Sequence, residues 1–308
     1  MNTKRWGALL AALVMIALLA AGCGPTTGPA AGGKLKVTVT TGMIADVVRN
    51  VGGDHVEVTA LMGSGVDPHL YKASEGDIAK LADAQIIFYN GLHLEGRMAD
   101  IFVTMAASKP TVPVAEGIDP SLLLETSAQT EDPHIWFDVT LWMKATEVVR
   151  DRLGEKDPAH KVDYEQSASA YLAELKALDD YARAQLATVP KAQRVLVTAH
   201  DAFSYFGRAY DVEVMGLQGI STAAEYGLND VQRLVDLLVE RKIKAVFVES
   251  SVPKRSIEAL VEGARAKGHT VVIGGQLFSD AMGAAGTPEG TYVGMVRHNV
   301  DTIVGALK

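Results

Sequence analysis

The amino-acid sequence predicts an α/β fold of two lobes, each built on a parallel β-sheet, joined by one long rigid helix. Short runs rich in β-branched residues alternate with helical patterns along most of the chain, which is the order that parallel sheets require. One central segment differs, because it is helical in pattern without interruption. We therefore expect an N-terminal lobe at 34–160, a linking helix at 161–189 and a C-terminal lobe at 190–308.

The predicted strands are short and bounded by turn residues or helical patterns. They are Lys36–Thr40, Val56–Leu61, Ile86–Tyr89, Arg194–Thr198, Ala245–Val248 and Thr270–Ile273, the last followed by a turn at Gly274-Gly275. Helices are expected between them at Ile44–Val51, Glu75–Leu81, Asp230–Arg241 and Ser256–Lys267.

The linking helix is predicted at Lys161–Ala187. This segment is rich in Ala, Leu, Glu, Lys and Gln, lacks Gly and Pro, and ends before Pro190, which is the composition of a strong helix former. At a rise of 1.5 Å per residue it would span about 40 Å. Its position between two halves of comparable size favours a connector, although the pattern also fits a long surface helix of a single domain.

Composition and charge exclude several classes of protein. The chain has 308 residues, of which 48% are hydrophobic and 21% charged, as in ordinary globular proteins. The formal net charge of −8 argues against nucleic acid as the main partner and favours cations over anions as ligands. A single cysteine excludes a disulfide framework and a multi-thiolate metal cluster.

Residues 1–22 are predicted to be a signal peptide. Two basic residues precede the uncharged apolar run Trp6–Ala21, which is too short for a membrane-spanning helix. The segment Leu19–Cys23 resembles a bacterial lipobox, in which the cysteine is lipidated and becomes the first residue of the mature protein. The alternative is a plain secretory signal with an incidental cysteine. Residues 23–33 are then expected to be the lipidated N-terminus and a flexible tether.

Three of the eight histidines occupy positions where a ligand could bind. His69 follows a predicted strand within Asp67-Pro68-His69, His134 lies in a second Asp-Pro-His, and His200 ends a strand. Ligands of open α/β sheets bind beyond the carboxyl ends of the strands, and an Asp-Pro pair fixes a rigid approach to the histidine. Asp280, after the last predicted strand, is a fourth candidate. Three imidazoles and one carboxylate suit a divalent transition metal.

The pattern alone leaves this interpretation open. The candidates are far apart in the chain and form no local metal motif such as HExxH. A single histidine after a strand is more often a structural or capping residue than a ligand. Both roles remain possible on spacing alone.

Six motifs that occur in order along the chain support the interpretation as a metal site. From Lys34 to Lys308 the chain resembles the metal-binding solute-binding lipoproteins of ABC transporters, the cluster A-I family, and within it the Tro-type members. The motifs are Val66-Asp67-Pro68-His69, Asn90-Gly91-Leu92-His93-Leu94-Glu95, Asp132-Pro133-His134-Ile135-Trp136, Thr198-Ala199-His200-Asp201-Ala202-Phe203, Glu249-Ser250-Ser251 and Phe278-Ser279-Asp280.

This resemblance implies a function as well as a fold. The ligands would be His69, His134, His200 and Asp280, holding one Zn²⁺ or Mn²⁺ in the cleft between two lobes. The protein would be a monomer that captures the ion without catalysis and delivers it to an ABC permease energised by a separate ATPase. It would lie outside the cytoplasm, in the periplasm or on the outer face of the membrane, anchored by a lipid on Cys23.

Other residues are expected to support the site. Glu249 ends a strand and is expected to orient a ligand histidine or to pair within the lobe interface. Glu225 is a weaker candidate for the same role. His93 lies in a family motif, but we expect a supporting or structural role rather than ligation. Trp136 and Trp142 could pack near the site, but we expect them in the apolar core.

The identity of the metal is not decided by the sequence. Zinc-dedicated members often carry a histidine-rich loop before the second ligand, and residues 117–133 contain no histidine. Manganese-dedicated members often have glutamate at the position of His200. A nitrogen-rich shell favours zinc in affinity, whereas a bidentate Asp280 would also admit five-coordinate manganese.

Two alternative functions remain at this point. A zinc-dependent hydrolase could use the three histidines and an open water position, although no motif supplies a general base. A binding lipoprotein for a metal chelate, such as an iron chelate or cobalamin, would not need the histidine and aspartate set.

Overall fold

The computed structural model describes residues 33–126 and 130–308. The predicted signal peptide, Cys23 and nearly all of the predicted tether therefore lie outside the described residues. Within the described ranges, no helix combines the length and apolarity needed to cross a membrane.

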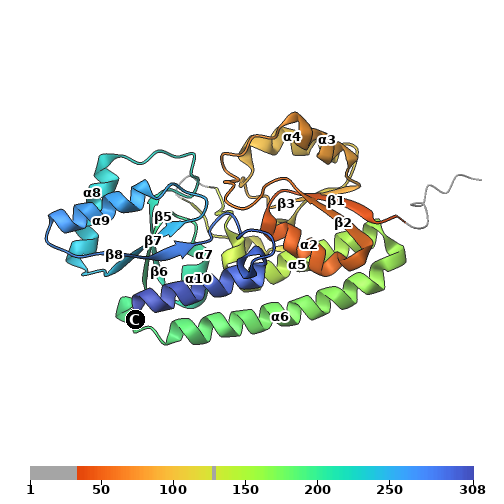
Figure 1. Ribbon diagram of the computed structural model, residues 1–308. Coiled ribbons are helices and arrows are strands. Elements are labelled where there is room, and N and C mark those ends of the chain that lie inside the picture. Colours follow the sequence, from red (N-terminus) through yellow and green to blue (C-terminus); the bar gives the residue numbers. More distant parts are fainter. Residues whose placement is uncertain (1–32, 127–129) are drawn as a thin grey trace, which may run out of the picture. The chain divides into compact units, whose positions relative to one another are not determined.

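Four parallel strands form a sheet from residues that precede the long helix (Figure 1). Its order is β2-β1-β3-β4, from β1 (Leu35–Val39), β2 (Val56–Ala60), β3 (Ile86–Tyr89) and β4 (Thr111–Pro113). Helix α2 (Gly42–Gly52) covers one face, and α3 (Glu75–Asp83) and α4 (Ala99–Ala106) cover the other. Ile86 and Phe88 join the cluster on the α2 side, whereas Ile87 joins the cluster under α3 and α4. Both faces are thus buried, as in parallel sheets generally.

Four further parallel strands come from residues after the long helix. They are β5 (Val195–His200), β6 (Glu213–Gln218), β7 (Ala245–Glu249) and β8 (Val272–Leu277). Strands β5 and β6 form one two-stranded parallel sheet, β7 and β8 form another, and β5 lies next to β7. Val195 and Val197 pack under α8 (Leu228–Glu240) and α9 (Arg255–Ala266). Leu196 faces the opposite core, to which α7 (Ser204–Tyr210) and α10 (Tyr292–Leu307) contribute.

Helix α6 (Lys161–Ala187) connects the two groups of strands and has the bounds predicted from the sequence. It contacts α2 and α5 (Val139–Lys156) from the earlier part of the chain, and α7 and α10 from the later part. Tyr171 Oη donates to Asp46 on α2 at 2.8 Å, and Tyr210 Oη on α7 donates to Asp179 on α6 at 3.2 Å. One hydrophobic cluster extends from β1 to α10 along this helical layer. The predicted α/β fold with a long helix is confirmed.

The predicted turn at Gly274-Gly275 is wrong, because both glycines lie inside β8. The predicted strand Thr270–Ile273 accordingly begins later and extends to Leu277. A Cβ atom on Gly275 would collide with Thr302, and one on Gly274 would collide with Ala306. Both partners belong to α10, so the glycines let this helix lie directly on the strand.

Candidate metal centre

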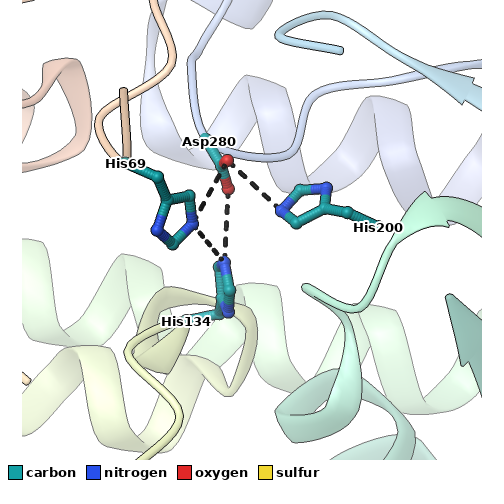
Figure 2. A group of neighbouring side chains, drawn as sticks. All are labelled: His69, His134, His200 and Asp280. Carbon is teal, nitrogen blue, oxygen red and sulfur yellow. Dashed lines mark hydrogen bonds and ion pairs between the residues drawn. The ribbon is translucent and has the colours of Figure 1, made fainter. Parts of the chain in front are cut away.

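Three segments at the carboxyl ends of strands and one that precedes a 3₁₀ turn bring four side chains together (Figure 2). His69 lies in the loop after β2, His200 is the last residue of β5, and Asp280 follows β8. His134 immediately precedes the short 3₁₀ turn Ile135–Phe137. One potential ligand atom of each residue lies within 4.8 Å of the others, and all four residues are buried. The structure therefore assembles the complete predicted set.

The Nε2 atoms of the three histidines are directed at the carboxylate of Asp280. The distances are 3.2 Å from His200 and 3.7 Å from His69 to Oδ2, and 3.5 Å from His134 to Oδ1. Even so, both Asp280 oxygens and His200 Nε2 are buried without a hydrogen-bond partner. Buried polar atoms are rarely left unpaired, because doing so costs free energy. The four side chains lie around a shared centre, as ligands of an ion do, and His69 Nε2 also lies 3.3 Å from His134 Nε2.

Each Asp-Pro-His motif uses its aspartate to fix the histidine backbone. The His69 N–H donates to Asp67 Oδ1 at 2.8 Å, and the His134 N–H donates to Asp132 Oδ1 at 3.0 Å. Asp132 Oδ1 also lies 2.7 Å from His134 Nδ1. Because an ionised carboxylate only accepts, Nδ1 carries the proton, and Nε2 is left to face the cluster.

Glu249, at the end of β7, holds His200 in a similar way. Its Oε2 lies 2.6 Å from His200 Nδ1, and its Oε1 accepts the His200 backbone N–H at 2.9 Å. Glu249 is itself buried. The contact with a candidate ligand histidine, which the sequence analysis anticipated for Glu249, is present.

His93 does not join the cluster. It is exposed and has a left-handed backbone with φ +63°. The same motif contributes differently, because Glu95 is buried and accepts from Thr40 Oγ1 at 2.7 Å and from the Asn90 N–H at 2.8 Å. Asn90 Nδ2 in turn donates to the Pro133 carbonyl at 2.9 Å. Asn90 and Glu95 therefore support the segment that carries His134, a role that the sequence analysis missed.

Glu225 is also outside the cluster, since it is exposed and makes no hydrogen bond or ion pair with the described residues. Trp136 is buried, as expected, and lies against the site. Its indole donates to the Ser279 carbonyl at 3.1 Å, directly before Asp280, and its ring lies 5.3 Å from that of His134. Asp132 was not singled out from the sequence, although the repeated Asp-Pro-His was an available signal.

Burial and neighbouring charges act in opposite directions on the pKa values of the cluster. Burial lowers the pKa of His69 to about 4. Burial acts in the same direction on His134, but Asp132 and Asp280 outweigh it and raise its pKa to about 9. Burial likewise disfavours the charged form of His200, but Glu249 and Asp280 together raise its pKa well above the usual range.

Asp280 responds in the opposite sense. Burial favours its protonated form, but His200 and His134 outweigh burial and hold its pKa well below the usual range. At neutral pH the metal-free cluster thus favours protons on the imidazoles of His134 and His200 and the charged form of Asp280. A dication with three neutral histidines would replace two protons without changing the net charge.

A family model described as the periplasmic component A of the zinc-uptake complex, ZnuA, matches residues 37–306. The chain belongs to the ZnuA family. This confirms the resemblance to metal-binding components of ABC transporters that the sequence motifs indicated.

Individual relatives of the family match over nearly their whole length. The manganese-binding lipoprotein MntA of Bacillus subtilis is 52% identical over 302 residues, covering 97% of this chain and 99% of its own. The metal ABC transporter substrate-binding lipoprotein FimA of Streptococcus parasanguinis is 30% identical over 311 residues, covering 99% of each chain. The solved structure of the periplasmic zinc-binding protein TroA of Treponema pallidum is 50% identical with a TM-score of 0.88, covering 89% of this chain and 99% of that one.

Proposed function

We propose that this protein is the extracytoplasmic solute-binding component of an ABC importer for Zn²⁺ or Mn²⁺. Its ligands for a single ion are His69, His134, His200 and Asp280. The observation that carries the proposal is the buried carboxylate of Asp280, whose two oxygens have no hydrogen-bond partner and face three imidazole Nε2 atoms. An ion at the centre would satisfy all of these atoms together.

The donor set suits both metals. Three imidazole nitrogens and both oxygens of Asp280 would give an ion a five-coordinate shell, which zinc and manganese both accept. The Irving–Williams order places zinc above manganese for the same ligands, so we expect tighter binding of zinc. The two metals named for the similar proteins, manganese for MntA and zinc for TroA, fit a site that admits either.

Burial supports capture over catalysis. The exposed fractions of the candidate ligands are 5% for His69, 2% for Asp280 and 0% for His134 and His200. A catalytic zinc site keeps one coordination position open for water and substrate. A cluster enclosed on every side instead suits an ion that is bound whole and later released, and we infer that the protein is not an enzyme.

The same proposal covers location and partners. Two candidate ligands precede α6 and two follow it, so the ion would join lobes 34–160 and 190–308 across the linking helix 161–189. We propose that the chain acts as a monomer anchored through a lipid on Cys23 and a tether at 23–33, and passes the ion to a permease with its own ATPase. The names of MntA and FimA as lipoproteins support the anchor.

Metal analysis of protein purified without an affinity tag tests the proposal directly. We expect one zinc or manganese ion per chain, removed by chelation and restored by titration with either ion. At free zinc about 1,000 times the dissociation constant, linkage adds about 4 kcal/mol to the free energy of unfolding, so the melting temperature should rise clearly. A His298→Ala variant is the matched control, since His298 contacts none of the four residues. A melt unaffected by both zinc and chelator would refute the proposal.

A further inference from the structure

The ring of His69 is held less firmly than the rings of the other two histidines of the cluster. His134 and His200 each place Nδ1 within 2.7 Å of a carboxylate oxygen, from Asp132 and Glu249. His69 Nδ1 has no such partner among the described residues. Apart from contacts within the cluster, where His69 Nε2 lies 3.3 Å from His134 Nε2, His69 is held through its backbone, by the N–H bond to Asp67.

The segment that carries His134 is also hydrogen-bonded to the part of the chain after α6, including the residue before Asp280. Trp136, two residues after His134, donates to the carbonyl of Ser279 beside Asp280. Tyr292 Oη donates to the Trp136 carbonyl at 2.7 Å, and Tyr205 Oη donates to the Asp132 carbonyl at 2.9 Å. Buried hydrogen bonds that involve no metal therefore fix the rings of His134 and His200 and the backbone next to Asp280.

The loop that carries His69 (residues 61–74) has a single comparable tie. Thr222 Oγ1 donates to Asp67 Oδ2 at 2.6 Å. Within the described residues, this is the one hydrogen bond between that loop and the chain beyond α6. The second oxygen of the same carboxylate holds the His69 N–H, so Asp67 connects Thr222 directly to the backbone of a candidate ligand.

Thr222 is anchored on the opposite side of the cluster. It lies in the loop between β6 and α8 (residues 219–227), where Gln218 Nε2 donates to the Thr222 carbonyl at 2.6 Å. Gln218 pairs with His200 in the β5–β6 ladder. A series of hydrogen bonds therefore connects strand β5, which ends at His200, to Gln218, Thr222, Asp67 and finally the backbone of His69.

We propose that Asp67 and Thr222 are positioning residues that seat His69 on the ion, and that their hydrogen bond limits the rate at which the ion leaves. His134, His200 and Asp280 receive the ion first as a preformed set. The His69 loop then closes over it and is held by Thr222. For the His69 loop to open, the hydrogen bond from Thr222 to the Asp67 carboxylate must break. A hydrogen bond to a charged acceptor is stronger than one between neutral groups. The inference rests on the proposed metal-binding function.

Replacement of the threonine hydroxyl isolates this contact. Thr222→Val keeps the shape of the side chain and removes the donor, whereas Thr222→Ser keeps the donor. We expect Thr222→Val to release zinc about tenfold faster, equivalent to about 1.4 kcal/mol. Association should change much less, since most effects of altered contacts fall on dissociation. Thr222→Ser should restore slow release.

The measurement is stopped-flow release of zinc from the full mature chain into excess fluorescent chelator, with association rates measured separately. Ser221→Ala is the matched control, because Ser221 Oγ accepts only from the Ala223 N–H within the same loop. Asp67→Asn, alone and combined with Thr222→Val, shows whether the two residues act through one bond. We expect the double variant to release zinc no faster than the faster single variant.

The outcomes separate this inference from the function on which it depends. If wild-type protein binds no ion, the proposed function fails and the inference fails with it. If wild type and Thr222→Val both bind one zinc ion and release it at the same rate, the inference alone is overturned. If Ser221→Ala releases zinc as fast as Thr222→Val does, the inference is also overturned, because the effect then comes from the loop in general. The same holds if Thr222→Ser releases zinc no more slowly than Thr222→Val.

Discussion

Glu249 Oε2 lies 2.6 Å from His200 Nδ1, and Glu249 Oε1 accepts the His200 backbone N–H at 2.9 Å. One carboxylate on β7 thus fixes both the ring and the backbone of a residue on the neighbouring strand β5. Both side chains are fully enclosed. The position of His200 Nε2 therefore depends on the contact between these two strands, which belong to different pairs.

The first prediction concerns this carboxylate. Glu249→Gln should weaken zinc binding 10–100-fold, the range typical of residues that orient a metal-binding histidine. The amide can accept only one of the two His200 hydrogens and carries no charge to favour the ring. Competition titration against a chelator of known affinity measures the change. Glu57→Gln, at an exposed position on β2, should leave affinity unchanged, and equal affinity of the two variants would contradict the prediction.

The long helix shows what local sequence decides. Lys161–Ala187 could be predicted with its observed bounds because helix formers continue without Gly or Pro until shortly before Pro190. Two strands, β4 and β6, were not predicted, because their local sequence does not indicate a strand. Strand β4 has only three residues, and β6 contains Gly216, where a Cβ atom would collide with the chain leaving β5 at Asp201. Only the tertiary structure specifies these elements.

The site divides in a similar way. The four members of the cluster could be predicted, because strand ends and ordered motifs indicate them without knowledge of their contacts. The residues that hold them could be predicted only in part. The bond from Trp136 to Ser279 joins positions 143 residues apart, and no pattern near either residue signals it. Asn90 looked like part of a histidine motif, whereas its role is to hold the Pro133 carbonyl.

The second prediction concerns pH. The carboxylates near His134 raise its pKa to about 9, and those near His200 raise its pKa as well. Below about pH 9 the metal-free protein therefore keeps protons on nitrogens that the ion needs. Binding must release them, so apparent zinc affinity should rise with pH through the neutral range. His69, with a pKa of about 4, releases no proton in this range.

Calorimetry in buffers of different protonation enthalpy counts these protons. We expect about two protons released per zinc ion at pH 7, one from His134 and one from His200. Dissociation constants at pH 6, 7 and 8 should fall steadily over the same interval. Binding heats independent of the buffer, together with a dissociation constant that does not vary with pH, would contradict the prediction.

The third prediction concerns the anchor. Cys23 follows a short apolar run after two basic residues, so the full-length protein expressed in a bacterial host should partition into detergent. Cys23→Ala should give a soluble or unprocessed form with unchanged zinc binding, because the cluster lies far along the chain from this position. Phase partitioning and intact-mass measurement follow the lipid. A processed Cys23→Ala protein that still partitions into detergent would show that another feature holds the protein at the membrane.

The fourth prediction ranks the members of the cluster. Asp280 faces all three imidazole Nε2 atoms and is the one anionic member of the set, so Asp280→Ala leaves a dication facing neutral nitrogens only. His69→Ala removes one neutral ligand and keeps the carboxylate. We therefore expect Asp280→Ala to weaken zinc binding at least as much as His69→Ala.

Asp280 also favours the protonated forms of His134 and His200, so its removal should lower the number of protons released per ion. Titration of the four single alanine variants, with proton counting for each, tests both statements. Zinc binding like that of wild type in all four variants would place the site elsewhere, and tighter binding by Asp280→Ala than by His69→Ala would show that charge does not dominate the affinity.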